Sequence, residues 1–391
     1  MFSTRVPSHR QPNRLTRAAD AARVRDPLID LTITNPTTVG IARPPSLLNP
    51  LISPRALIYE PHPFGLREAR EAVADDYARR GIRIATDRIV LTASTSEAYS
   101  LLFKLLCAPD GDAVLVPTPS YPLFDHLTRL DGVAAAPYRL EYHGRWTLDT
   151  HSVDEAWGSN VRAVLAVSPN NPTGSRLSPA ELDALQTRCA ARNAALIVDE
   201  VFADFPLGRA EADDVPVRAR EGESGALTFR LGGLSKSVGL PQLKLGWIAV
   251  EGPPGLVREA LERLELMCDT YLSVSTPVQI AARELLDAGA AIRAPIVERL
   301  RTNDESLRRA AAARPSVQVL PSDAGWSAVV RVPSTRSEEE LALELIERDR
   351  VLVHPGFFFD FPHEAFIVVS LLPEPARFAR GVQALMERAS A

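Results

Sequence analysis

The sequence predicts an α/β protein, with a large domain built on a mostly parallel sheet flanked by helices and a smaller α+β domain at the C-terminal end. Between about residues 88 and 250, short apolar runs alternate with helical patterns, which is typical of a parallel sheet covered by helices. The apolar runs are continuous, as a sheet buried on both faces requires. Beyond Pro253 the pattern changes to long helices and then to short strands. A chain of 391 residues is long enough for two hydrophobic cores.

Composition narrows the class of protein. Hydrophobic residues make up 46% of the chain and charged residues 24%, which is ordinary for a globular protein. The net charge is −5 and the charges are interspersed, so we expect no nucleic-acid partner. No apolar run approaches the length of a membrane span, and we expect no membrane partner.

The cysteines and histidines point to no metal site. Cys107, Cys189 and Cys268 are widely separated and odd in number, so they fit neither a disulfide framework nor a metal site and suggest a reducing compartment. The seven histidines show no metal-ligand spacing. We therefore expect a cytoplasmic protein that binds no metal.

Residues 1–45 are expected to form an N-terminal arm and the start of the small domain. The first 25 residues carry several arginines and superficially resemble a transit peptide, but there is no apolar segment for secretion, and Pro12 and Asp20 argue against an amphipathic presequence. The apolar run 28–33 predicts a strand that ends at Asn35, because the residue before Pro36 is disfavoured in a helix.

Residues 46–290 are expected to form the large domain. Prolines make its beginning irregular, and a helical pattern follows from Leu66 to Ala78. The expected strands are 88–91, 113–116, 133–137, 163–167, 195–198, 227–231 and 246–250, and the expected helices between and after them are 96–107, 123–130, 178–192, 256–267 and 278–287.

Residues 291–391 are expected to form the small α+β domain, with a long helix as the bridge to it. The expected helices are 292–313, 338–348 and 376–389, and the expected strands are 317–320, 327–332, 351–353 and 366–370.

Polar residues follow several of the expected strands, at the edge where open parallel sheets bind ligands. The segment 92–97 places hydroxyls at a helix N-terminus, which suits a phosphate but equally suits an ordinary N-cap. Prolines flank Tyr121 in 117–122, so its ring could stack on a flat ligand or sit in a rigid turn. Asn171 in 170–174 could donate to a phenolic oxygen, although turns favour the same residues.

A carboxylate and a lysine complete this set. Asp199 ends a buried strand, where a carboxylate needs a cation or a strong donor such as a protonated ring nitrogen. Lys236 stands between two serines in a glycine-rich turn, where exclusion of water would lower the pKa of its amine and allow attack on a carbonyl. A solvated surface lysine is the alternative when this turn is considered alone. Together the segments match the groups of pyridoxal phosphate.

The chain resembles the fold-type I pyridoxal phosphate enzymes of the class I/II aminotransferase family over nearly its whole length. The motifs that carry the resemblance are N-P-T-G at 171–174, D-E-V-F at 199–202 and S-K at 235–236. The resemblance implies that Lys236 forms the Schiff base with the cofactor and then moves the proton. It also implies that Asp199 pairs with the ring nitrogen, that Asn171 holds the ring hydroxyl oxygen and that Tyr121 stacks on the ring.

The same resemblance assigns further roles. Ser94, Thr95 and Ser96 would bind the phosphate, with Lys244 as its cationic partner, and Ser235 would line the cofactor beside the lysine. Tyr59 would reach the phosphate of a neighbouring subunit, which implies a homodimer. Asn35 and Asn171 would lie on the substrate side.

Four positions depart from the family pattern. Phe202 replaces a tyrosine that binds the ring oxygen, and Gly233 replaces a phosphate-binding serine. Lys244 replaces an arginine, so a point charge stands in for a two-pronged donor. Val368 occupies the position of the arginine that clamps the substrate carboxylate, so a carboxylate substrate would need another cation.

The resemblance implies an aminotransferase that moves an amino group from an amino acid or amine donor to a keto acid. A lyase or decarboxylase using the same cofactor is the alternative, because Val368 weakens the expected carboxylate clamp. The resemblance also allows a non-catalytic ligand sensor, but the family's regulators of that kind carry an N-terminal DNA-binding domain. We disfavour a sensor, because about thirty residues before the first strand are too few for a helix-turn-helix unit. A dinucleotide or nucleotide enzyme is also disfavoured, since the glycine-rich fingerprints are absent from the sequence.

Overall fold

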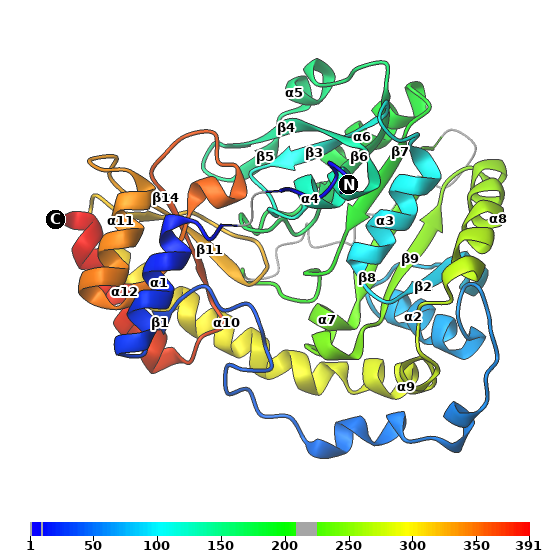
Figure 1. Cartoon of the computed structure of the whole chain (residues 1–391), viewed down its shortest axis with the longest axis horizontal. Coiled ribbons are helices and arrows are strands. Elements are labelled where there is room, and N and C mark those ends of the chain that lie inside the picture. The colour runs from blue at the N-terminus through cyan, green and yellow to red at the C-terminus, as the bar shows by residue number, and fades with distance from the viewer. Residues whose placement is uncertain (1, 9–10, 209–224) are drawn as a thin grey trace.

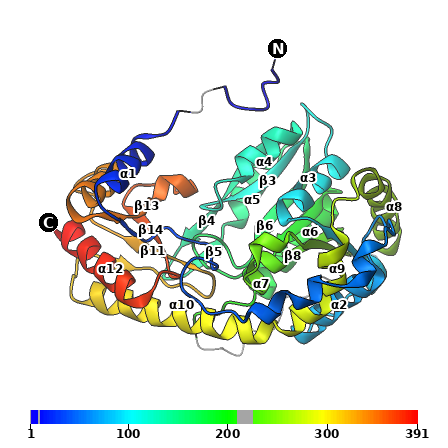
Figure 2. The same cartoon turned by 60° about the horizontal axis from the view of Figure 1, so that its bottom comes forward.

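The computed structural model describes residues 2–8, 11–208 and 225–391. Figure 1 shows two parts, a large one around a long twisted sheet and a smaller one that carries the C-terminus. The long helix α10 (Gly289–Ala312) runs beneath both of them, as Figure 2 shows. The expected α/β fold class, with a large domain and a smaller α+β domain, is confirmed.

The large sheet has the strand order β2-β9-β8-β7-β6-β3-β4-β5. The five strands β8, β7, β6, β3 and β4 run parallel to one another, whereas β9 and β5 pair antiparallel with β8 and β4, and β2 pairs antiparallel with β9. The sheet is therefore mostly parallel, as predicted. Its strands are β2 (Ile89–Thr92), β3 (Ala113–Thr118), β4 (Ala134–Tyr142), β5 (Trp146–Leu148), β6 (Val161–Val167), β7 (Ala195–Asp199), β8 (Thr228–Gly233) and β9 (Gly246–Glu251).

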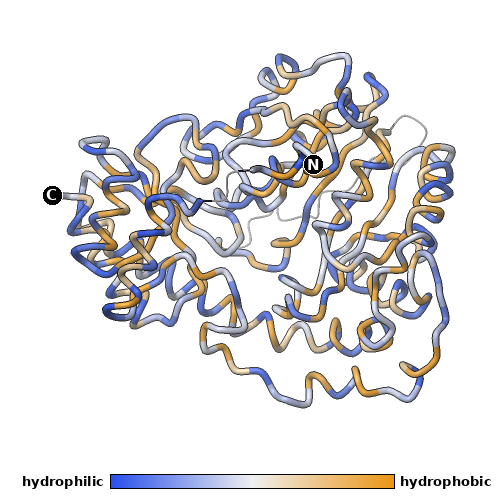
Figure 3. The backbone as a smooth tube through the Cα atoms, in the orientation of Figure 1, coloured by the Kyte–Doolittle hydropathy of each residue, from blue (hydrophilic) through white to orange (hydrophobic). Residues whose placement is uncertain are grey.

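Helices cover both faces of this sheet because its strands are apolar on both faces. Val114 and Val116 of β3 belong to the core cluster under α3, α4 and α8, while Leu115 belongs to the cluster under α6. Figure 3 shows the same interior as apolar segments within a polar outer layer. The helices of this part are α2 (Arg67–Arg79), α3 (Thr95–Leu106), α4 (Phe124–Asp131), α5 (Thr150–Glu155), α6 (Pro179–Ala191), α7 (Leu234–Ser237), α8 (Pro254–Tyr271) and α9 (Thr276–Asp287).

Sequence features explain where these helices begin. Ser178 caps α6, its hydroxyl accepting from the Glu181 N–H while the Glu181 carboxylate accepts from the Ser178 N–H, and Pro179 occupies the first position. Short 3-10 turns fill the connections at η1 (Pro45–Leu51), η2 (Pro54–Leu57), η3 (Thr86–Arg88) and η4 (Pro241–Leu243). In the described ranges no helix is long and apolar enough to cross a membrane.

The smaller part contains a four-stranded antiparallel sheet in the order β10-β11-β14-β13. Residues Val330, Ile367 and Val369 face the core that α10 and α12 cover, and the opposite face carries Val368. The elements are β10 (Gln318–Val319), β11 (Ser327–Arg331), α11 (Glu338–Glu344), η5 (Leu345–Asp349, a π-helix), β12 (Val351–Leu352), β13 (His354–Pro355), η6 (Gly356–Phe359), β14 (Phe366–Ser370) and α12 (Pro375–Ser390).

The N-terminal segment contains a helix that the sequence pattern does not predict. Helix α1 (Arg14–Arg25) begins at Asn13, whose side chain accepts from the Thr16 N–H at 2.7 Å. The helix packs through a few small apolar residues, Leu15, Ala19 and Ala22, so its apolar pattern is weak. The strand expected at 28–33 is short, and β1 (Ile29–Asp30) pairs parallel with β12 of the smaller part.

A glycine turn joins the two parts. The Gly174 carbonyl accepts from the N–H groups of Asp323 and Ala324, at 3.2 and 3.0 Å. Gly174 has φ +67°, and a Cβ atom there would lie 1.8 Å from the Ser322 Oγ and 2.2 Å from the Ala324 carbonyl oxygen. Only glycine fits this conformation and this close approach.

We predict that Gly174→Ala lowers the free energy of unfolding by roughly 3 kcal/mol or more, because a left-handed alanine is strained and its methyl group meets backbone. Gly144→Ala is the matched control, since Gly144 has φ +85° and nothing within 4 Å, and strain alone should cost about 1 kcal/mol. Urea unfolding of both variants measures the difference. Equal losses would contradict the close approach at Gly174.

Candidate active site

Two neighbouring parallel strands bring the principal polar groups together at one edge of the large sheet. Asp199 is the last residue of β7 and pairs in register with Leu231 of β8. Strand β8 continues through Gly232 and Gly233 into the short helix α7, which carries Lys236. The lysine turn therefore follows the carboxylate at the carboxyl end of the parallel strands, where open sheets bind ligands.

Asp199 is a buried carboxylate held by neutral donors. It is 6% exposed, Tyr99 Oη donates to its Oδ2 at 2.6 Å, and the Val201 N–H donates to its Oδ1 at 3.0 Å. Burial raises the pKa of Asp199, and these two hydrogen bonds oppose the rise. Such a carboxylate favours a cationic partner.

The adjacent carboxylate shows the contrast. Glu200 forms ion pairs with Arg230 and, at 3.5 Å, with Arg80, and Arg230 also binds Glu251. Among the described residues Asp199 belongs to no such pair, although it is one residue away. Arginines of the protein therefore neutralise Glu200, whereas Asp199 has hydrogen bonds from neutral donors only.

Lys236 is enclosed by aromatic rings. Its Nζ lies 5.5 Å from the ring centroid of Phe202 and 4.9 Å from that of Trp326, which belongs to the smaller part. Burial lowers the pKa of Lys236, and the charge of Asp199 partly opposes that effect. A lowered pKa favours the free amine, which is the nucleophilic form. Ser235 precedes it in α7 and is partly buried.

The first turn of α3 lies against the same strands. A Cβ atom on Gly246 would be 3.0 Å from the Ser94 carbonyl carbon and 3.1 Å from the Thr95 nitrogen, and Gly246 pairs in register with Gly233. Ser94 is also an ordinary N-cap, its Oγ accepting from the Glu97 N–H at 3.1 Å. The Ser94 side chain is therefore already hydrogen-bonded within the helix. The backbone N–H groups of a helix's first turn suit an anion. Ser96, in the same turn, is exposed.

The two proline-flanked loops lie at this edge as well. Tyr121 is 39% exposed, and burial, together with the charge of Asp199, raises the pKa of its phenol. The Asn170 amide donates to Ser120 Oγ at 3.3 Å and its oxygen accepts from Thr173, so Asn170 fixes the loop. Asn171 is partly buried, and its side chain makes no hydrogen bond to the described residues, which leaves its amide for a ligand.

The structure does not bring three other expected residues to Lys236. Asn35 is exposed and its Oδ1 accepts from the Thr37 N–H at 3.0 Å, although its segment is tied to β14 because Ser370 Oγ donates to the Ile33 carbonyl. Lys244 is exposed after η4, with φ +55°. Within the described residues, neither side chain forms a hydrogen bond or ion pair with Lys236.

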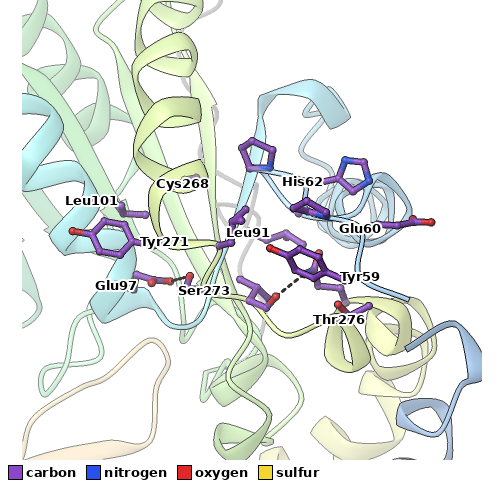
Figure 4. Close-up of a pocket in the computed structure, with 16 residues that line it drawn as sticks. Tyr59, Glu60, His62, Leu91, Glu97, Leu101, Cys268, Tyr271, Ser273 and Thr276 are labelled. Atoms are coloured by element: carbon purple, nitrogen blue, oxygen red, sulfur yellow. Dashed lines mark hydrogen bonds between the residues drawn. The ribbon is translucent and has the colours of Figure 1, made fainter. Parts of the chain in front are cut away.

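Tyr59 lies in a different place, 74% exposed, in a pocket between its own segment and the chain around Tyr271 and Thr276. Figure 4 shows this pocket, with Ser273 donating to Glu97 at 2.8 Å. Lys236 does not line this pocket, so Tyr59 lies apart from the lysine of its own chain.

The position that lacks the family's arginine is apolar. Val368 is 1% exposed in β14 and pairs in register with His354 of β13, so both side chains lie on one face of that sheet. Burial lowers the pKa of His354, although the charge of Asp30 opposes the change. A neutral imidazole thus lies next to the valine.

Two site residues have no sequence motif that identifies them. Tyr99 lies on the inner face of α3 and binds Asp199, one hundred residues away. Trp326 is 2% exposed and covers Lys236 together with Phe202, which packs edge-on against it at 5.5 Å. Both residues reach the site through contacts with residues far away in the sequence. For Trp326 the sequence offers one weak signal, its position directly after Gly325.

Comparisons with known proteins agree with this geometry. Residues 54–385 match the family described as aminotransferase class I and II. The chain is 25% identical over 381 residues to glutamate-pyruvate aminotransferase AlaA of Haemophilus influenzae, covering 95% of this chain and 91% of that protein. It is also 25% identical over 398 residues to alanine aminotransferase of Mycobacterium bovis, covering 99% and 89%.

Solved structures share the fold. An aminotransferase from Escherichia coli superposes with a TM-score of 0.87 at 22% identity, covering 100% of this chain and 98% of that one. Tyrosine aminotransferase from Leishmania infantum superposes with a TM-score of 0.82 at 19% identity, covering 99% and 100%. With a family match over most of its length and this fold, the chain belongs to the aminotransferase class I and II family and is a transferase of that class.

Proposed function

We propose that the protein is a pyridoxal 5'-phosphate-dependent aminotransferase, with Lys236 as the residue that binds the cofactor covalently and moves the proton. The observation that carries the proposal is a buried carboxylate, Asp199, which forms no ion pair with a described residue, together with a half-buried amine of lowered pKa, Lys236, whose charge acts on it. Buried groups with shifted pKa values at the end of a parallel sheet are typical of catalytic sites.

The residues present fit this cofactor. Asp199 lacks a cationic partner among the described residues, which a protonated ring nitrogen would supply. The Lys236 amine suits an aldehyde. The Asn171 amide suits the ring hydroxyl oxygen, and the α3 N-terminus at Ser94, Thr95 and Ser96 suits the phosphate.

When bound, the cofactor supplies an electron sink that makes the α-hydrogen of an amine acidic. The protein does the rest. Asp199 keeps the ring nitrogen positive, because a buried carboxylate is stabilised by a fixed cation. Tyr121 would stack on the ring, and Lys236 would accept and return the proton, for which its lowered pKa suits it. Phe202 and Trp326 exclude water from the amine.

Three further assignments belong to the same proposal. Lys244 would act as the phosphate's cation, and Ser235 would line the cofactor beside Lys236. Asn35 and Asn171 line the substrate side. Residues 1–45 form the arm and the start of the small domain, 46–290 the cofactor-binding domain and 291–391 the small domain.

We propose an amino acid or amine as the donor and a keto acid as the acceptor. The relatives named for the glutamate-pyruvate and alanine reactions support an amino acid donor. Val368 is apolar and buried where the family has a carboxylate-binding arginine, which favours a site that binds the donor carboxylate less strongly than the family does. For the same reason elimination or decarboxylation is the second candidate reaction.

We also propose a cytoplasmic homodimer. Large apolar side chains are exposed along one stretch of surface, and such a patch favours association. They are Leu48, Ile52, Leu57, Ile58, Tyr59 and Tyr271. In a dimer through this surface Tyr59 reaches the partner's phosphate site. The three free, separately buried cysteines suit a reducing compartment.

The covalent role of Lys236 has a direct test. We expect purified protein, reconstituted with pyridoxal phosphate, to be yellow and to retain the cofactor after borohydride reduction. Lys236→Ala should lose the trapped cofactor, because it removes the amine that would form the reducible bond to the aldehyde. Lys104→Ala is the control, since Lys104 is paired with Asp131 on the surface. Colourless wild-type protein after reconstitution would refute the cofactor proposal.

A screen of amino donors separates the two candidate reactions. We expect amino acids to convert the bound cofactor to its pyridoxamine form, followed through its absorbance, and a keto acid to restore it. Amines without a carboxylate should also react, because Val368 offers the carboxylate no charge. Release of a keto acid or carbon dioxide without the pyridoxamine form would establish a lyase or decarboxylase instead.

The dimer can be tested through its apolar surface. Ile58→Asp should shift the protein from dimer to monomer in analytical ultracentrifugation, because it buries a charge in the contact. Val24→Asp, on the exposed side of α1 at 88% exposure, should leave the dimer intact.

If Tyr59 crosses between subunits, inactive Tyr59→Ala and Lys236→Ala chains should regain activity when mixed. A monomeric wild type would refute the dimer.

A further inference from the structure

A tyrosine outside the motifs of the sequence holds the carboxylate of the site. Tyr99 lies in α3, 2% exposed, and its Oη donates to Asp199 Oδ2 at 2.6 Å. Phe103 stacks beside its ring at 6.0 Å, and Phe124 meets the ring edge-on at 5.4 Å. The aromatic packing fixes where the phenol points, so its hydroxyl is directed at one oxygen of Asp199.

The phenol is a donor at every working pH. Burial and the adjacent charge of Asp199 raise the pKa of Tyr99 well above its usual value. Tyr99 therefore stays protonated, and its hydrogen bond to Asp199 favours the ionised carboxylate. A hydrogen bond to a charged group is stronger than one between neutral groups.

Asp199 depends on such donors because its surroundings oppose its charge. Burial and the charge of Glu200 raise its pKa, while Lys236 and the Val201 N–H lower it, and Tyr121 faces it as another neutral phenol. With Val201 on Oδ1 and Tyr99 on Oδ2, the carboxylate plane is fixed from both sides.

We propose that Tyr99 is a positioning residue for the reaction, and that its hydroxyl keeps Asp199 ionised and in the orientation that meets the ring nitrogen of the cofactor. This inference rests on the proposed function. Tyr99 touches neither cofactor nor substrate in this role and acts through Asp199, so removing the hydroxyl weakens the pairing with the ring nitrogen and leaves Lys236 in place.

The test is Tyr99→Phe, which retains the aromatic packing and removes the donor. Tyr138→Phe is the matched control, because Tyr138 is equally buried in the same domain and donates to the Leu165 carbonyl at 2.9 Å, in β6. The measurements are the dissociation constant of pyridoxal phosphate and the nitrogen-15 chemical shift of ring-labelled cofactor, which reports protonation of the ring nitrogen.

We expect Tyr99→Phe to weaken cofactor binding by roughly tenfold, the effect of losing one hydrogen bond to a charged group. The ring-nitrogen signal should move toward the unprotonated position. Without the donor the pKa of Asp199 rises, so the pairing should be lost at a higher pH than in wild type as the pH falls. Tyr138→Phe should resemble wild type in both measurements. Equal behaviour of the two variants would overturn the proposal.

Two further arms keep the test decisive. In an Asp199→Ala background Tyr99→Phe should cause no additional loss of affinity, since the partner is gone, and an additive loss would overturn the inference. If Tyr99→Phe fails to fold, 3-fluorotyrosine at position 99 replaces it, since it is a stronger donor of nearly the same size. It should move the loss of pairing between Asp199 and the ring nitrogen to lower pH. No movement would overturn the inference. Wild type that binds no cofactor would overturn the proposed function itself.

Discussion

The burial of one unpaired carboxylate is the constraint on which the site depends. Asp199 ends a central strand of an apolar sheet, where an ionised group is costly without a partner. Two neutral donors, the Tyr99 hydroxyl and the Val201 amide, favour its charged form and fix its orientation, and Asp199 forms no ion pair with a described residue. A positively charged ligand group would stabilise this carboxylate, and in the proposed function Lys236 would supply the covalent attachment beside it.

The smaller part of the chain contributes to this environment. Trp326 belongs to it, yet its ring lies 4.9 Å from the amine of Lys236 in the larger part. The Ser120 N–H donates to the Phe359 carbonyl at 3.0 Å, next to Tyr121. These contacts explain why the lysine loses water, and therefore why its pKa is lowered, although its own turn consists of small residues.

Local patterns predict much of this structure. The apolar runs of β3, β6 and β7 are buried on both faces, and Ser178 with Glu181 marks the start of α6. Asp199 and Lys236 follow from strand ends and from the resemblance to a family. Local patterns fail where long-range contacts decide. Tyr99 is one apolar position among several in α3, and only its contact with Asp199 distinguishes it. Helix α1 has too weak an apolar face to be recognised, and β5 is a three-residue strand defined by its pairing with β4.

The neighbouring carboxylates Asp199 and Glu200 have different partners. Glu200 is neutralised by Arg230 and Arg80, whereas Asp199 stays available, and one step along the chain separates them. Successive residues of a strand point to opposite faces, so a slip of β7 by one residue would exchange the two. The pairing of β7 with β6 and β8 in this register therefore determines which of the two carboxylates accepts from the Tyr99 hydroxyl.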